Sequence, residues 1–325
     1  MSSSGMRAAA PPRIATLLPS ATEIVCALGL EEALVAVSHS CDFGGRIESL
    51  PRVTRTRVPI GAPSREIDAT VREYLHRGES LYQLDQPLLE ALRPQLIVTQ
   101  SLCEVCAVGP AEVSRAIPSL TSQPRIITLA PRTLEEVFGA IQAVGSAVGR
   151  ATPAKALVRN LRARVDAVRA RTAELTHRPR VAFLEWADPP ICGGHWNPEL
   201  IELAGGRDGL GRPGEPSRVV GWDEVLAWEP EVLVLACCGF DETRNREEME
   251  TLRRRPGFER LPCARTGRSY ALDGVRLFSR PGPSLIESLE RLAAVVIPSG
   301  ARDRPAHESE QRSLARRADP SLRSG

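Results

Sequence analysis

The two halves of this chain repeat one another, and this duplication limits the folds open to it more than any other feature. A helix that ends in glycine, Ser20-Ala-Thr-Glu-Ile-Val-Cys-Ala-Leu-Gly29, returns as Asn197-Pro-Glu-Leu-Ile-Glu-Leu-Ala-Gly-Gly206. A short helix, a proline and an apolar strand then follow in both halves, at residues 88–99 and 225–235. Two α/β units on one chain commonly face each other across a cleft, and clefts are where small ligands bind.

The length and charge of the chain suit a two-lobed protein whose partner is a small molecule. The 325 residues are enough for two cores, and the net charge of +2 creates no field that would attract nucleic acid or a membrane surface. No apolar run approaches the roughly 20 residues that span a bilayer. The first residues lack the apolar region of a signal peptide. We therefore expect a cytoplasmic protein as the chain is written, and a periplasmic or cell-surface protein if the start is misassigned.

The pattern of apolar residues divides the chain into five segments. Residues 1–12 and 298–325 have no apolar period and are expected to be a disordered lead and a disordered tail. Residues 13–131 and 179–297 each alternate strands with helices, which is typical of an α/β lobe. Residues 132–178 keep a helical period and form the connection. The expected fold class is therefore α/β, with two Rossmann-like lobes joined by a long helical strut.

Local signals mark several element boundaries. Ser20 with Glu23, and Thr133 with Glu136, have the spacing of a capping box, in which two side chains bond to backbone N–H groups at a helix start. Residues 44–80 show no clear pattern, and we assign no element there. The expected strands cover residues 13–18, 34–38, 96–100, 125–129, 180–186, 232–236 and 269–272.

Most of the reactive side chains follow directly after the predicted strands. Ligands in open α/β sheets bind outside the carboxyl ends of the strands, so we expect these side chains to line the cleft. Six of the eight cysteines belong to this group. The candidate ligand-binding residues of this kind are His39, Ser40, Asp42 and Glu104 in the first lobe, and Trp186, His195, Trp196 and Phe240 in the second.

Cys103 and Cys106 have the spacing of thiolate metal ligands or of a redox pair. Cys41, from the neighbouring strand end, would supply a third ligand for zinc or for an iron–sulfur cluster. The alternative is a pair of small buried thiols that pack a loop. One hypothesis for function is therefore a cytoplasmic metal- or iron–sulfur-binding redox protein.

Two loops carry side chains suited to a flat or anionic ligand. His195 and Trp196 follow two glycines, which allow a backbone to approach a ligand closely; the alternative is a loop histidine whose neighbour packs onto the lobe. Arg280 is placed to pair with an anionic group, or is an ordinary loop arginine. The chain has no phosphate loop, nucleophile elbow or zinc-protease motif, so an enzyme is not favoured, although one acting on a tetrapyrrole stays open.

Several of these motifs resemble those of one family. Leu17-Leu-Pro-Ser-Ala-Thr-Glu23 and Val37-Ser-His-Ser-Cys-Asp42 resemble the substrate-binding proteins of vitamin B12 and iron–siderophore transporters. Gly194-His-Trp-Asn-Pro and Ser279-Arg-Pro-Gly-Pro283 resemble the cobalamin-binding branch. The resemblance spans residues 13–297 and implies a helical-backbone periplasmic-binding-protein-like fold. It also implies that a corrinoid (cobalamin-like) or related metal chelate lies between the lobes. His39 or His195 could approach the cobalt there, although the resemblance does not require it.

The chain departs from the exported members of that family in two respects. It carries no signal peptide or lipid anchor as written. Transporter-coupled members also present an exposed carboxylate on each lobe to dock on permease arginines. The lobe-two position falls near Asp223, whereas the lobe-one position falls near Pro87, so one docking acid is absent. The resemblance therefore implies a corrinoid-binding protein more directly than it implies an ABC permease as partner.

Overall fold

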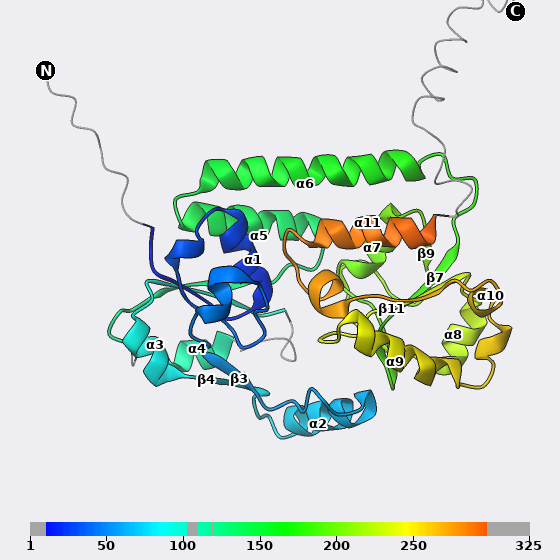
Figure 1. Cartoon of the computed structure of the whole chain (residues 1–325), viewed down its shortest axis with the longest axis horizontal. Helices are drawn as coiled ribbons and strands as arrows, with labels where there is room; N and C mark the ends of the chain where they lie inside the picture. Colours follow the sequence, from blue (N-terminus) through cyan, green and yellow to red (C-terminus); the bar gives the residue numbers. More distant parts are fainter. Residues whose placement is uncertain (1–10, 103–109, 117, 119, 298–325) are drawn as a thin grey trace, which may run out of the picture.

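The structure is a computed structural model that describes residues 11–102, 110–116, 118 and 120–297. Its two α/β lobes lie side by side, and helix α6 (Ala151–Thr172) runs above both of them (Figure 1). The predicted class, α/β with two lobes built on parallel strands, is confirmed. Within the described ranges, no helix has the length and apolar character needed to cross a membrane.

Lobe one is built on a four-stranded parallel sheet with the order β2-β1-β5-β6. Its central strands β1 and β5 are buried at every position, because helices cover both faces of a parallel sheet and leave neither face open to solvent. A separate antiparallel pair, β3-β4, extends the lobe. The strands are β1 (Ile14–Thr16), β2 (Leu34–Ala36), β3 (Thr54–Thr56), β4 (Tyr82–Leu84), β5 (Leu96–Gln100) and β6 (Arg125–Leu129), and the helices are α1 (Pro19–Ala27), α2 (Ser64–His76), α3 (Gln86–Leu92) and α4 (Pro110–Ala116).

Lobe two has a parallel centre with an antiparallel margin. β7 pairs in parallel with β9 and β11, and β11 pairs in parallel with β12, whereas β8 and β10 add an antiparallel edge. The strands are β7 (Arg180–Ala187), β8 (Pro190–Cys192), β9 (Arg207–Asp208), β10 (Arg218–Val219), β11 (Val232–Leu235) and β12 (Ser269–Ala271), and the helices are α7 (Asn197–Leu203), α8 (Trp222–Trp228), α9 (Glu242–Arg253), α10 (Pro262–Arg265) and α11 (Leu285–Val296).

The helical connection consists of two helices that pack on each other. α5 (Leu134–Ala147) ends before Gly149, whose φ of +72° favours glycine, and α6 then turns back over it. The buried face of α6 joins a large apolar cluster that also contains Ile14 of lobe one and Val181 of lobe two. The lobes therefore share a continuous core beneath the strut. The residues that form the buried stripe of α6 are Ala154, Val158, Leu161, Val165 and Val168.

The expected capping box at the start of α1 does not form. The helix begins at Pro19, and proline suits this position because it has no backbone N–H that would need a hydrogen-bond acceptor. The buried Ser20 hydroxyl has no hydrogen-bond partner among the described residues. Glu23 instead accepts hydrogen bonds from the backbone N–H and the hydroxyl of Ser284 in the other half of the chain. At α5, Thr133 caps the helix as expected, by accepting from the N–H of Glu136.

Candidate functional site

A cavity of about 470 Å³ lies between the two lobes. Its volume falls in the range of small-ligand sites, and its lining includes three carboxylates and two guanidiniums, which suits a polar group better than an apolar one. Lobe one and the segment that leads into α11 each contribute one wall. The lining residues are Glu23, Asp42, Phe43 and Gly44 on the first wall, and Arg276, Arg280, Ser284 and Glu287 on the second.

Arg280 is the group that joins the two walls. It is only 6% exposed, and its Nη2 donates to Oδ1 of Asp42 at 2.6 Å. Its guanidinium also lies 5.2 Å from the centre of the Phe43 ring. A guanidinium has five donors in a planar fork and bonds well to carboxylate or phosphate oxygens. Arg280 can therefore exchange Asp42 for an acceptor on a ligand without leaving its place.

The backbone that carries Arg280 is held from several sides. A π-helical turn, Gly274–Phe278, precedes Arg280. Its first residue, Gly274, packs so closely against the Cys237 carbonyl that a Cβ at this position would overlap the carbonyl oxygen. The Asp273 carboxylate accepts from the N–H of Arg276 at 2.8 Å. The indole N–H of Trp196 donates to the Phe278 carbonyl at 2.9 Å. Such turns recur at functional sites, and this one aims Arg280 at lobe one.

Glu23 forms a second link between the walls. Its carboxylate accepts from the Ser284 hydroxyl at 2.9 Å and lies against Gly282, where any Cβ would overlap it. Burial raises the pKa of Glu23, while the hydrogen bonds from Ser284 act in the opposite direction. The cavity therefore contains a carboxyl that is shielded from solvent and already satisfied by the opposite wall.

The predicted lobe-one residues lie at different distances from this cavity. Asp42 lines it, whereas His39 and Ser40 are not among its lining residues. The His39 Nδ1 is 2.7 Å from the Thr54 hydroxyl, and burial, aided by Arg52, lowers the pKa of this imidazole. The Ser40 hydroxyl lies 2.8 Å from that of Ser38. Glu104 lies outside the described residues.

In lobe two, Trp186 and Phe240 pack together outside the 470 Å³ cavity, with ring centres 5.1 Å apart. The indole N–H of Trp186 donates to the Ser64 carbonyl of α2 at 3.2 Å. His195 is half-buried, has a positive φ of 53°, and has its pKa lowered by burial and by Arg132. Trp196 is 5% exposed and belongs to the core, where it supports the Arg280 segment instead of facing the cavity.

The metal hypothesis is tested by the structure only at Cys41. This residue is 2% exposed, and its Sγ lies 3.1 Å from the Thr22 hydroxyl. Burial raises the pKa of the Cys41 thiol, which disfavours the thiolate that metals bind. Cys103 and Cys106 lie outside the described residues. Among the residues that are described, no group of three or more His, Cys, Asp or Glu side chains has the geometry of a metal site.

Glu185 is a perturbed residue that the sequence analysis missed. It lies at a β-bulge in β7, between Leu184 and Trp186. Burial of its carboxyl raises the pKa to about 7, even though Gly194 and Ser217 donate hydrogen bonds to it. The signal in the sequence is a glutamate that follows four apolar residues of a strand and directly precedes Trp186, a predicted cleft residue.

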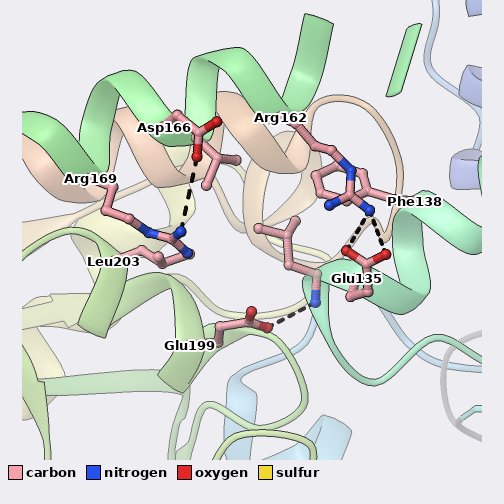
Figure 2. A pocket seen from close by; sticks show the side chains of 9 residues that line it. Glu135, Phe138, Arg162, Asp166, Arg169, Glu199 and Leu203 are labelled. Atoms are coloured by element: carbon pink, nitrogen blue, oxygen red, sulfur yellow. Dashed lines mark hydrogen bonds and ion pairs between the residues drawn. The ribbon is translucent and has the colours of Figure 1, made fainter. Parts of the chain in front are cut away.

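A second cavity of about 150 Å³ lies between α5, α6 and α7 (Figure 2). Arg162 donates to both carboxylate oxygens of Glu135, at 2.5 and 2.7 Å, and lies 4.9 Å from the centre of the Phe138 ring. Glu199 of lobe two accepts from the N–H of Leu134 at 2.9 Å, at the start of α5. The charged groups drawn in Figure 2 bond to other groups of the protein. We therefore interpret this region as a contact between the helical connection and lobe two, and not as a ligand site.

The family model for periplasmic binding proteins matches residues 88–275. This chain belongs to the periplasmic binding protein family. None of the curated proteins matches it. In this chain, the candidate site lies between the two lobes.

Solved structures of similar proteins agree with the fold. The haem-binding protein of Pseudomonas aeruginosa is 22% identical, with 89% of this chain and 94% of that chain covered and a TM-score of 0.69. The haem-binding protein RhuT of Roseiflexus sp. RS-1 is 23% identical, with 88% and 98% covered and a TM-score of 0.66. The vitamin B12-binding protein BtuF of Vibrio cholerae is 21% identical, with 90% and 99% covered and a TM-score of 0.63. The fold is therefore common to proteins named for two different ligands.

Proposed function

We propose that this protein is the substrate-binding component of an ABC-type uptake system, and that it holds a corrinoid or a related metal chelate in the cavity between its lobes. Membership of the periplasmic binding protein family supports the transport role. The observation that carries the proposal is Arg280, a buried guanidinium that reaches across the cavity to Asp42 and lies over Phe43.

The two walls match the chemistry of a flat macrocycle with polar edges. Phe43 offers an aromatic face, while Arg280 and the exposed Arg276 offer donors to carboxylate, phosphate or amide oxygens at the edge of the ligand. When the ligand enters, its acceptor replaces Asp42 on Arg280. The lobes must part to admit it, because the Arg280–Asp42 and Glu23–Ser284 bonds hold the walls together.

Delivery to a permease would require a position outside the cytoplasmic membrane, and we propose that site of action over a cytoplasmic one. Asp223, exposed on α8, is the carboxylate that lobe two would present to a permease arginine. Pro87, exposed on α3, occupies the corresponding place on lobe one without a charge. Cell fractionation with an antibody to the native protein tests this part, and recovery in the cytosol alone would remove it.

The binding proposal is tested by absorption titration and calorimetry with cobalamin, haem and a ferric siderophore. We expect one of these ligands to bind, and Arg280→Gln to weaken that binding at least about tenfold, because a charge-assisted bond to a buried site is lost. Arg159→Gln, on the exposed face of α6, is the matched control and should bind as the wild type does. No spectral shift and no heat with all three ligands would sink the proposal. Zinc or an iron–sulfur cluster in the anaerobically purified protein would then favour the redox alternative.

A further inference from the structure

Helix α2 belongs to lobe one by sequence but packs on lobe two. It lies at the edge of the molecule opposite the strut helix α6, beneath the second lobe and near α9 (Figure 1). Ile67 of α2 is 5% exposed and is part of the apolar cluster of lobe two. Val58 and Val71 pack against that cluster and also against the apolar cluster of lobe one. The segment from Val58 to Val71 is therefore a second connection between the lobes, and it joins them through side-chain contacts with both apolar clusters.

A buried carboxylate completes this connection. Glu248 of α9 is 6% exposed, and it accepts from the Ser64 hydroxyl at 2.8 Å and from Arg244 Nη2 at 3.0 Å. Arg244 also donates to the Ala62 carbonyl at 2.9 Å. A buried charge is costly unless it is fully paired, so undocking of α2 would leave Glu248 one donor short until water reached it. The Arg65–Asp188 pair at 2.8 Å lies at the exposed rim and contributes little.

The same helix covers two aromatic side chains that were predicted to bind ligand. The single N–H of Trp186 is used by the Ser64 carbonyl. Phe240 packs against Trp186 on one side, and the guanidinium of Arg244 lies 4.8 Å from its ring centre. Since Arg244 is itself held by Ala62, the docked helix keeps this aromatic pair covered.

We propose that α2 is a latch that pins lobe one to lobe two opposite the strut, and that it must release Ser64 from Glu248 and Trp186 before the lobes part to exchange a ligand. The strut joins the lobes at one edge and the latch joins them at the other, so the lobes part only when the latch is released together with the Arg280–Asp42 and Glu23–Ser284 bonds across the cavity. The polar and apolar contacts of α2 are few and are the weaker of the two connections, whereas the strut is covalent and shares the main core. The link to ligand exchange rests on the proposed function, while the latch itself does not.

The test uses Ser64→Ala and Glu248→Gln in the full chain, with Glu250→Gln as the matched control, because Glu250 lies on the exposed face of the same helix α9. Amide hydrogen exchange of residues 64–76 is measured without ligand. We expect roughly tenfold faster exchange in both latch variants and no change in the control, because Ser64→Ala removes a hydrogen bond to a buried charge and Glu248→Gln removes that charge. For whichever of cobalamin, haem and the ferric siderophore binds, the stopped-flow rate of association should rise in the same variants, because the open form is more populated.

Three results would overturn the latch. Exchange of α2 in both variants equal to that of Glu250→Gln would show that these contacts do not hold the helix. Faster exchange of α2 with unchanged rates of ligand association and release would show that the helix does not gate the cleft. If none of the three ligands binds the wild type, the proposed function fails separately. The latch is then judged by small-angle scattering, where an unchanged radius of gyration in both variants would refute it.

Discussion

The fold raises the pKa of the Glu185 carboxyl well above the ordinary value of a glutamate. Its carboxyl is enclosed at the end of β7 and receives hydrogen bonds from Gly194 and Ser217, yet burial still raises its pKa to about 7. Its backbone carbonyl accepts from Cys238, so the residue also ties β7 to the loop after β11. The glycine loop that carries His195 is therefore anchored by a group that changes charge near neutral pH.

This shift predicts a pH-dependent gain of stability in Glu185→Gln. Between about pH 4.5, the ordinary value, and pH 7, the folded wild type keeps a proton that the unfolded chain loses, so its stability falls as the pH rises through this window. Glutamine stays neutral and still accepts hydrogen bonds. We expect the variant to exceed the wild type by up to about 3 kcal/mol at pH 8 and to gain little at pH 4.

Urea unfolding at both pH values measures this difference. Glu174→Gln, at an exposed position, is the control and should show no such pH dependence. A gain in Glu185→Gln that is equal at pH 4 and pH 8 would contradict the assignment of the proton to Glu185.

Asp42 and Arg280 illustrate what can be predicted for single residues. Both were singled out as ligand-binding from the strand end and from the loop motif, and both line the cavity. Their 2.6 Å ion pair could not be predicted, because they lie 238 positions apart and meet only when the lobes dock. The glycine-rich loop motif predicts that Trp196 binds ligand, but its aromatic ring packs in the core.

Among the helices, the packing of α5 on α6 depends on one glycine. A Cβ at Gly145 would overlap the methyl group of Ala154, which is fully buried. Gly145→Ala should therefore lower the free energy of unfolding by about 1–3 kcal/mol, because the two helices must move apart. Thermal or urea unfolding followed by far-UV circular dichroism measures this loss.

The same helix offers the opposite case as a control. Gly139 is exposed and has open space where a Cβ would point. Gly139→Ala should raise stability by up to about 1 kcal/mol, since alanine is the better helix former. If both substitutions changed the free energy of unfolding in the same direction, close packing at Gly145 would not explain the effect of Gly145→Ala.

The sequence analysis assigns no element to the residues that form α2, although they show a helical pattern of apolar residues. Ile67, Val71 and Leu75 recur every four residues, which is typical of one helix face. The helix is otherwise polar, and its apolar residues are divided between the clusters of two lobes. A helix that serves two cores needs fewer apolar residues for each, so its pattern is weaker than that of α5 or α11.

The contact between the lobes can be measured through the Asp42–Arg280 pair. Arg280 is buried and Asp42 is partly exposed, so each loses a partner when the other is changed. In a double-mutant cycle with Asp42→Asn and Arg280→Gln, we expect a coupling energy of about 1–2 kcal/mol. Urea unfolding of the four proteins provides it, and strictly additive costs would mean that the pair does not hold the lobes together.

Taken by itself, the sequence determined the two α/β lobes, the helical connection between them and the strands β1, β2, β5, β6, β7, β11 and β12, but not the short strands β3, β4, β8, β9 and β10. These features depend on residues close together in the chain, whose apolar period, prolines and glycines act locally. Only the tertiary structure decided where the cavity lies, that Glu23 bonds to Ser284 instead of capping α1, and that α2 docks on the opposite lobe. Each of these depends on how two separately encoded lobes pack together, and no local pattern in the chain specifies that contact.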